Sequence, residues 1–249
     1  MQAHSDWLVA QGLGAQVRGG MTTRVGGVSL PPFDSMNLRL LEDDPQAVQL
    51  NRQRLAVAIG ATPVFLNQVH GHRAVRLTGA DIDASASIHD ADASHTTERG
   101  VACTVMVADC LPVLFSAPDG AGVAAAHAGW RGLAGGILEA TALGLSQAVA
   151  CPPSHLRAWL GASIGPQQFE VGEDVVQAFG MQAQQHFTKI AKPGKWLADL
   201  PGLARQRLAS LGIVHVDGGQ WCTVSNTSMF FSFRRERVTG RMAATICRV

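Results

Sequence analysis

The sequence is poor in charge, and no segment of it accumulates charge of one sign. Only 16% of the 249 residues are charged, and the formal net charge is +1. A face that binds nucleic acid through non-specific electrostatics is therefore not expected. Long apolar runs are also missing, because none approaches the ~20 residues that span a bilayer.

Targeting and disulfide signals are missing too. The N-terminal stretch MQAHSDWLVAQG has neither the basic start nor the apolar centre of a signal peptide. The five cysteines are odd in number, scattered and without a CxxC pair, which is typical of a reduced protein. We therefore expect a cytoplasmic monomer or homodimer with no membrane partner and no nucleic-acid partner.

Several catalytic motifs are absent. The chain has no GxxxxGK[ST] phosphate loop, and it lacks the HxE with PCxxC of the zinc nucleobase deaminases. It has one HxH, at His70 and His72. Multicopper oxidases hold their coppers with several such pairs, so a true laccase is not expected.

What is present is a mixture of apolar strands and a few helices, without repeats or linkers. Strands are expected near residues 15–22, 63–70, 72–77, 101–108, 111–117, 123–128 and 156–162, with short ones at 221–225, 229–235 and 241–249. Helices are expected at 45–60, 132–150, 173–187 and 200–211. Adjacent strands interrupted by single helices favour an α+β (mixed α/β) fold, with mixed sheets and helices packed outside.

Three residues with metal-binding side chains come at the ends of apolar strands. They are His70 in NQVHG, Cys110 in VADCLPV and His127 in AAAHAGWRG. Single ligands from separate strands fit a catalytic metal site, which has three protein ligands and one open position. Two other interpretations stay open: the three residues belong to the core, or Cys110 is a nucleophile with His127 as its base.

The residues after His127 favour an anion-binding site. Arg131 precedes a glycine-rich helix start, where free N–H groups and a guanidinium attract anions. Arg24 in TTRVGG is a second loop arginine of the same kind, and Trp130 could stack on a planar ligand or belong to the core. GASIG at 161–165 also matches the GxSxG nucleophile elbow at Ser163, a motif with a real chance of random occurrence.

Read together, eight stretches resemble the YfiH-like proteins, also called laccase-domain or polyphenol oxidase-like proteins. The resemblance runs from about Arg18 to Ile246. It rests on TTRVGGVSLPPFDSMNL, DDPQAVQLNR, NQVHG, ADAS, VADCLPVLF, AAAHAGWRG, GASIGPQQFEVG and FFSFRRERVTGRMA. ADC followed by HAGWRG at this spacing is specific to the family.

The resemblance implies a four-layer α/β/β/α arrangement in a single domain, residues 1–249. It also implies a metal, usually zinc with copper possible, at the positions that match His70, Cys110 and His127. The implied reaction is phosphorolysis of adenosine, inosine and methylthioadenosine to base and sugar 1-phosphate, with adenosine deamination as a side activity. Relatives often carry alanine at the position of Ser163, which argues against a serine nucleophile.

The chain departs from the family pattern in one segment. Relatives usually read NLGxHxGDDP after the long loop, whereas this chain reads NLRLLEDDP. Arg39 replaces a glycine, a histidine is lost, and the segment Arg39–Glu42 is one residue shorter. If the lost histidine lines the pocket in relatives, the substrate preference of this chain is open.

We therefore expect a metal-dependent purine nucleoside phosphorylase whose small-molecule partners are purine nucleosides and phosphate. Asp109 and Arg131 are the expected catalytic residues, and Arg24, Asn37 and Trp130 are expected to bind substrate. Asp109 has an alternative interpretation, as a partner that holds a ligand histidine. The alternative functions are a cysteine-type hydrolase or amidase that edits cell-wall peptide precursors and a copper-dependent polyphenol oxidase.

Overall fold

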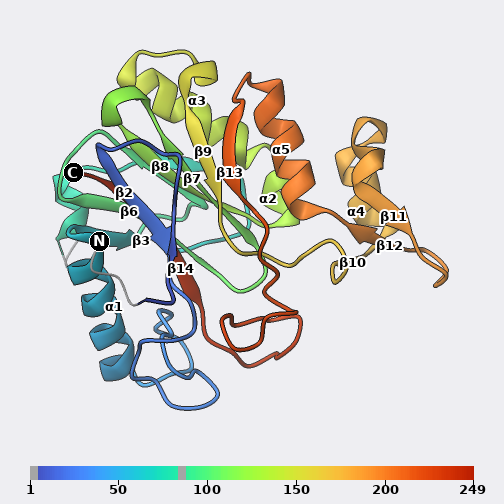
Figure 1. Cartoon of the computed structure of the whole chain (residues 1–249), viewed down its shortest axis with the longest axis horizontal. Coiled ribbons are helices and arrows are strands. Elements are labelled where there is room, and N and C mark those ends of the chain that lie inside the picture. The colour runs from blue at the N-terminus through green and yellow to red at the C-terminus, as the bar shows by residue number, and fades with distance from the viewer. Residues whose placement is uncertain (1–4, 84–87) are drawn as a thin grey trace.

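Two large mixed sheets pack face to face and carry helices on their outer faces (Figure 1). The computed structural model describes residues 5–83 and 88–249, so residues 1–4, on which the signal-peptide prediction partly rests, lie outside the described part. The first sheet has the order β1-β2-β14-β6-β3 and consists of Leu8–Val9, Val17–Met21, Met242–Arg248, Val101–Val107 and Thr62–Phe65. Its last pair, β6 and β3, is parallel, and the others are antiparallel.

The second sheet has the order β13-β9-β7-β8-β5-β4. It consists of His215–Gly218, Arg157–Leu160, Leu111–Ser116, Val123–Ala128, Ala93–Thr96 and Ala74–Arg76. The pairs at both edges are parallel, and the three central pairs are antiparallel. Both sheets are therefore mixed, as the sequence pattern predicts.

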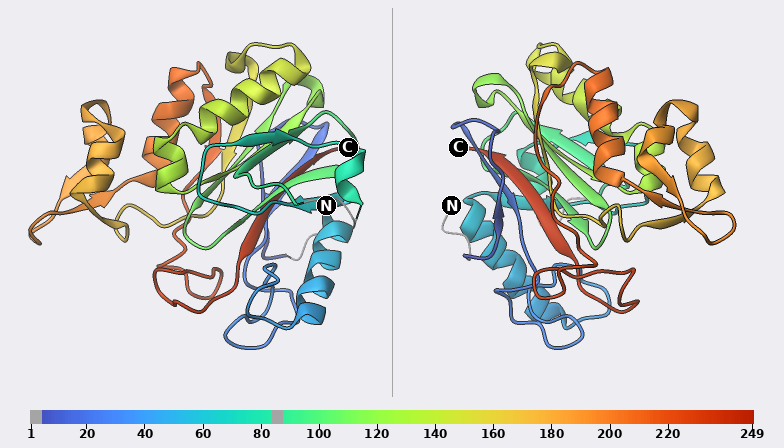
Figure 2. Two further views of the ribbon diagram at one scale, coloured as in Figure 1. Left: turned by 180° about the vertical axis from the view of Figure 1, so that it is seen from behind. Right: turned by 45° about the vertical axis from the view of Figure 1, so that its right-hand side comes forward.

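Helices cover the two outer faces of this sandwich. Helix α1 (Pro45–Ile59) packs on β3 and β14 of the first sheet, whereas α3 (Ile137–Val149) packs on β8, β5 and β4 of the second. Helix α5 (Leu200–Ser210) lies beside α3 (Figure 2). The expected α/β/β/α order of layers is confirmed.

Strand β7 shows why its sequence is apolar throughout. Leu114 points into the core between the sheets, while Val113 and Phe115 point into the core under α3 and α5. All six residues of β7 are buried. A strand covered on both faces loses the polar alternation of a half-exposed strand.

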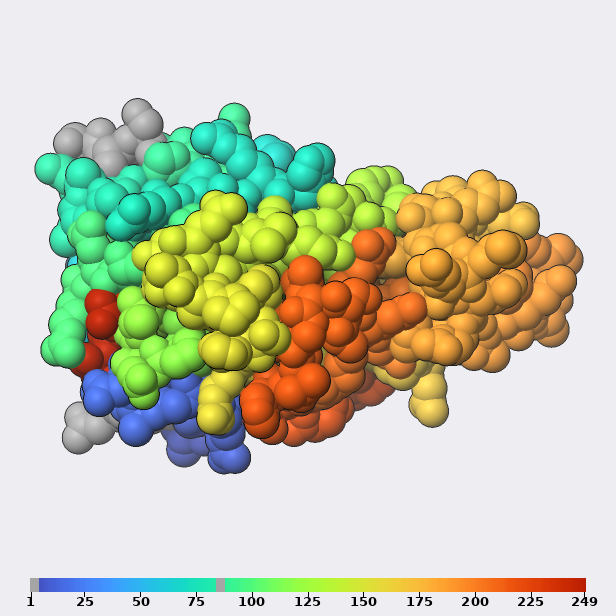
Figure 3. Space-filling model, turned by 90° about the horizontal axis from the view of Figure 1, so that it is seen from above, coloured from blue at the N-terminus to red at the C-terminus, as the bar shows by residue number. Residues whose placement is uncertain are grey.

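A smaller unit projects from one end of the sandwich (Figure 3). It contains a three-stranded sheet, β10-β12-β11, together with α4 and the 3-10 helix η4. The strands are β10 (Glu170–Gly172), β12 (Lys195–Ala198) and β11 (Phe187–Lys189), and the helices are α4 (Glu173–Phe179) and η4 (Met181–His186). Buried residues of this unit, including Phe169 and Val171, pack into the same core as α5.

Glycines break two of the expected helices. The helix expected at 132–150 is two helices, α2 (Trp130–Ala134) and α3, because Gly136 between them adopts φ 93°. That backbone conformation is open to glycine and strained for other residues. The helix expected at 173–187 ends at Phe179, and Gly180 with φ 73° precedes η4.

Two of the expected short strands are also wrong. Residues 221–225 and 229–235 form turns and loops, apart from one isolated bridge at Cys222. Phe230 and Phe231 are fully buried in the core between the sheets. Their burial gives an apolar run that imitates a strand.

The remaining helical segments are short 3-10 turns, η1 (Gly79–Ile82), η2 (Pro118–Gly120) and η3 (Pro153–His155). Among the described residues no helix is long and apolar enough to cross a membrane. All five cysteines lie in the described part, and each of them is free.

The long loop between β2 and α1 is held by one buried side chain. Asn51 of α1 accepts a hydrogen bond from the Val28 amide at 2.9 Å. Its Nδ2 donates to the Ser29 hydroxyl and to the carbonyls of Ser35 and Asn37, at 2.9–3.1 Å. Asn51 therefore fixes the loop that carries residues 39–42.

Replacing Asn51 by alanine is expected to lower the free energy of unfolding by about 2–3 kcal/mol, because buried backbone groups lose their partners. Urea denaturation of both proteins measures the difference. The matched control is Gln53→Ala, an exposed position on the same helix, where a change within about 0.5 kcal/mol is expected. Equal losses for both variants would contradict this role of Asn51.

Candidate metal centre and active-site cavity

The chain passes from the first sheet to the second twice at the same place. The connection from β3 to β4 carries His70, and the sharp turn from β6 to β7 carries Cys110. His127 lies near the end of β8, paired with Pro112 of β7. Chain topology therefore brings the three predicted ligands together, and their ligand atoms lie within 4.8 Å of one another.

Gly129 makes this close approach possible. A Cβ atom at this position would lie 2.9 Å from Cys110 Sγ and 3.4 Å from His70 Cδ2. Any side chain here would push the thiol and the imidazole apart. The first glycine of the HAGWRG motif is thus required by the packing of the ligands.

Asp92, at the residue before β5, organises two of the three ligands. Its carboxylate is fully buried and accepts a hydrogen bond from His127 Nδ1 at 2.8 Å. The same carboxylate accepts the backbone amides of His70 and Gly71 at 3.0 and 2.7 Å, and that of Val69 at 3.2 Å. Because an ionised carboxylate only accepts, Nδ1 of His127 is the protonated nitrogen and Nε2 is free to bind a metal.

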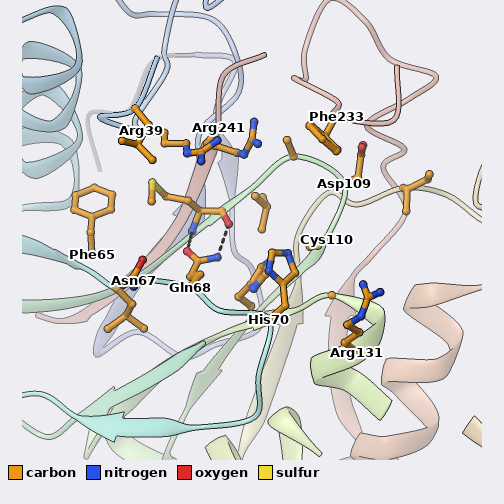
Figure 4. A pocket seen from close by; sticks show the side chains of 18 of the residues that line it. Arg39, Phe65, Asn67, Gln68, His70, Asp109, Cys110, Arg131, Phe233 and Arg241 are labelled. Carbon is orange, nitrogen blue, oxygen red and sulfur yellow. Dashed lines mark hydrogen bonds between the residues drawn. The ribbon is translucent and has the colours of Figure 1, made fainter. Parts of the chain in front are cut away.

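A second side chain, that of Gln68, ties the His70 loop to strand β6 of the first sheet. Gln68 donates from Nε2 to the Met106 carbonyl at 2.8 Å and accepts the Met106 amide at 2.7 Å. Figure 4 shows this pair of hydrogen bonds beside His70. Strand β3 ends at Phe65, and the Gln68 side chain then takes the place of a backbone partner for β6. These hydrogen bonds hold the chain two residues before His70, whose backbone has a φ of 59°.

Half-buried Cys110 and buried His127 stabilise each other's charged forms. Burial alone would raise the pKa of the Cys110 thiol, but the charge of His127 and hydrogen bonds with both imidazoles lower it below its ordinary value. Burial would lower the pKa of His127, but the Cys110 thiolate and the Asp92 carboxylate raise it. For Asp92, hydrogen bonds from His127 and the Gly71 amide outweigh burial and lower the pKa. The thiolate that results is the form of cysteine that binds metals.

The donor set fits a metal ion. Zinc bonds of about 2.0–2.3 Å at tetrahedral angles place the ligand atoms of one ion about 3.3–3.6 Å apart. The three ligand atoms here lie within 4.8 Å of one another, so a shift of about 1 Å brings them to these separations. His127 is 3% exposed, while His70 faces solvent. All three residues line the cavity, so a metal held by them would be accessible to a ligand of the cavity. The hydrogen bond from His127 to the Asp92 carboxylate is the kind that metal-binding histidines usually make with their other ring nitrogen.

The ligands lie in the wall of a cavity of about 1060 Å³. Trp130 and Arg131 of α2 also line it, and the Arg131 guanidinium lies over the Trp130 ring at 4.4 Å. Arg131 is exposed, and no carboxylate forms an ion pair with it among the described residues. Both residues are therefore where a ligand of the cavity could contact them.

Asp109 lines the cavity beside Cys110 but has a different partner from the one expected. In the described part of the chain, its carboxylate accepts the Thr223 hydroxyl and the Arg234 amide, each at 2.6 Å. Asp92 is the residue that contacts a ligand histidine, so the interpretation of Asp109 as a histidine partner is wrong. Asp109 instead ties the turn at φ 98° to the loop 223–234.

Two expected substrate-binding residues lie outside the cavity lining. The Arg24 guanidinium donates to Asp34 and to the Thr227 carbonyl at 3.0–3.2 Å, which joins two loops. Asn37 is 1% exposed, and its Oδ1 accepts the amides of Arg39 and Arg241. Direct contact of either side chain with a ligand in this cavity is not supported.

The divergent segment is part of the cavity, because Arg39, Leu40, Leu41 and Glu42 all line it. Ser163, in contrast, is fully buried and does not line it. A nucleophile elbow at Ser163 is therefore wrong. The segment 39–42, in contrast, forms part of the cavity wall.

Sequence reasoning missed Asp92 and Arg241 as residues of the site. Asp92 stands in the ADAS stretch, where an acidic residue directly before a buried strand was the available signal. Arg241 stands 171 residues after His70, and its place in the FFSFRRERVTGRMA stretch of the family resemblance was the available signal.

Comparisons with known proteins agree with this geometry. The family model described as multi-copper polyphenol oxidoreductase laccase matches residues 18–249. A purine nucleoside phosphorylase of Pseudomonas aeruginosa is 48% identical over 93% of each chain. The purine nucleoside phosphorylase YfiH of Escherichia coli is 47% identical over 90% of this chain and 91% of its own.

Solved structures show the same fold. A Neisseria meningitidis protein superposes with a TM-score of 0.91 at 43% identity, and covers 98% of this chain and 99% of its own. YlmD from Geobacillus stearothermophilus superposes with a TM-score of 0.88 at 32% identity, and covers 100% of this chain and 98% of its own.

Changing Asp92 to asparagine is expected to weaken metal binding about 10–100-fold. The neutral amide oxygen is a poorer hydrogen-bond acceptor for His127, and the NH₂ group cannot accept the hydrogen bonds that the backbone N–H groups of the His70 loop donate. Competition with a chromophoric zinc chelator measures the dissociation constant. Asp119→Asn makes the same chemical change at an exposed position and should leave the affinity unchanged. Equal affinities in all three proteins would show that Asp92 does not support the ligands.

Proposed function

The chain belongs to the multi-copper polyphenol oxidoreductase laccase family, and from this premise we propose that it is a metal-dependent purine nucleoside phosphorylase. The observation that carries the proposal is that relatives 47–48% identical over at least 90% of the chain have that name. The cavity supports it, since three residues that could hold a metal ion and a cation, Arg131, line the same cavity.

The reaction has a simple balance of bonds. An oxygen of inorganic phosphate forms a bond to C1′ of the ribose, and the bond from C1′ to the purine nitrogen breaks. The base leaves with that electron pair and takes up a proton, which gives free base and sugar 1-phosphate. Negative charge moves from phosphate to base, so fixed positive groups at both ends lower the barrier.

Three residues of the cavity are assigned parts in this scheme. Arg131 binds the phosphate, because a guanidinium pairs with phosphate oxygens through two N–H groups. Trp130 provides an apolar wall for a planar substrate. Asp109 is assigned a positioning role, since both of its oxygens hold the loop 223–234.

The metal is assigned to His70, Cys110 and His127. Zinc is the preferred ion, because it accepts mixed nitrogen and sulfur ligands and leaves one position open in catalytic sites. When bound, it supplies a Lewis acid beside the reacting groups. Copper would use the same ligands, and adenosine deamination is included as a side activity. The free cysteines favour the reducing cytoplasm.

A phosphate-dependence assay tests the proposal. Metal-loaded protein is incubated with adenosine, with and without phosphate, and the products are separated by chromatography. Adenine is expected only with phosphate, and Arg131→Ala is expected to raise the KM for phosphate at least about tenfold. Adenine without phosphate, inosine as the only product, or no product from any purine nucleoside would each contradict the proposal.

One observation favours a second candidate, a cysteine-dependent hydrolase or amidase acting on a cell-wall peptide precursor. The low pKa of Cys110 beside His127 is also the arrangement of a thiol nucleophile and its base. In that case the thiol must be free of metal during turnover.

Alkylation separates the two candidates. For the phosphorylase, chelators are expected to abolish adenosine turnover, and bound metal should protect Cys110 from an alkylating reagent. For the hydrolase, chelators would change nothing, and labelling of Cys110 in metal-free protein would abolish turnover of the peptide. Mass spectrometry of the labelled peptide identifies the modified cysteine, with buried Cys103 as the internal control.

A further inference from the structure

The cavity has a second cationic wall, away from Arg131. Arg39, Arg52 and Arg241 line this wall. In Figure 4 the Arg39 and Arg241 side chains lie together, and His70 and Cys110 lie between this pair and Arg131. The two positively charged places are thus separated by the metal ligands.

A single buried amide holds the arginine pair. Asn37 Oδ1 accepts the backbone amides of Arg39 at 3.1 Å and Arg241 at 2.9 Å. Its Nδ2 donates to the Arg39 carbonyl at 3.1 Å and to Asp43 Oδ2 at 2.8 Å. The two arginines are far apart in sequence, yet one amide of the protein interior fixes both backbones. The pair is therefore built into the fold.

The three arginines of this wall have no ion-pair partner in the described part of the chain. No carboxylate there lies within ion-pair distance of Arg39, Arg52 or Arg241. The carboxylates that line the cavity are Glu42, Asp90 and Asp109. Burial and the neighbouring charge of Arg39 lower the pKa of Arg241 and outweigh the opposite effect of Glu42, Asp109 and Cys110. Like charges held together in a half-buried place favour an anion between them.

The hydrogen-bond donors of the wall are only partly used. Arg241 Nη1 donates to the carbonyls of Thr239 and Gly240, which leaves Nη2 and Nε without a protein acceptor among the described residues. Arg52 donates from Nε to the Leu38 carbonyl and lies over the Phe65 ring at 3.9 Å. Arg39 uses only backbone groups in its hydrogen bonds within the described chain.

We propose that Arg39 and Arg241 form a second anion subsite that binds a phosphate dianion. Two guanidinium groups match the charge and the several acceptor oxygens of phosphate. A cavity of about 1060 Å³ is at the upper end of small-ligand pockets, which leaves room for a phosphate beyond a nucleoside. The dianion comes either as the ester group of a purine nucleotide or as inorganic phosphate. This subsite goes beyond the proposed reaction, because binding requires no turnover.

Isothermal titration calorimetry on metal-loaded protein in phosphate-free buffer tests the subsite. The probes are AMP, adenosine and inorganic phosphate, and the variant is Arg39→Ala. Loss of one charge-assisted contact is expected to raise the dissociation constant of the bound anion at least about tenfold and to leave that of adenosine unchanged. Arg39→Lys, which keeps the charge, is expected to retain most of the affinity.

Arg99→Ala is the matched control, because it removes one exposed positive charge that does not line the cavity. It is expected to change none of the three affinities. Thermal unfolding checks that each variant is folded, and within the described residues the Arg39 side chain makes no hydrogen bond whose loss would destabilise the fold.

The two sources of phosphate give different results. If Arg39→Ala lowers the affinity for AMP but not that for inorganic phosphate, the subsite binds the phosphate ester of a nucleotide. If it lowers the affinity for inorganic phosphate as well, the subsite binds the free dianion. If neither affinity changes, or if the affinity for adenosine falls equally, the proposal is overturned. Failure of phosphorolysis in the adenosine assay would leave these binding results intact, so the two failures are distinguishable.

Discussion

The buried carboxylate of Asp92 is the interaction on which the centre depends. One side chain fixes the nitrogen with which His127 can bind a metal, and it also holds the backbone that carries His70. A buried negative charge is costly unless it is fully hydrogen-bonded, and here four N–H groups share it. Hydrogen bonds within the protein therefore position His127 and the His70 loop, which is the preorganisation that a catalytic site requires.

The position of the centre follows from the crossing of the chain between two sheets. Both connections at this edge run from the first sheet to the second, and each carries one ligand. Loops from opposite ends of the sequence then close the walls, with residues 39–42 on one side and 233–241 on another. Asn51 and Asn37 connect these loops to the core, so the electrostatic character of the cavity is fixed by buried amides.

The sequence predicted the His70, Cys110 and His127 cluster better than its surroundings. His70, Cys110 and His127 end or interrupt apolar strands, and strand ends can be recognised from local pattern alone. Asp92 and Arg241 act through contacts between segments remote in sequence, which no local pattern contains. The mixed sheets and outer helices were predictable from periodicity, but Phe230 and Phe231 imitated a strand because burial and strand pairing give similar apolar runs. Gly135 and Gly136 were a visible signal for the helix break.

X-ray absorption spectroscopy at the zinc edge, on protein loaded with one equivalent of zinc, identifies the atoms that bind the metal. We expect one sulfur ligand at about 2.3 Å, together with nitrogen or oxygen ligands at about 2.0–2.1 Å. Loss of the sulfur contribution in Cys110→Ser would assign it to this cysteine. A first shell without sulfur in the unaltered protein would contradict a centre built from His70, Cys110 and His127.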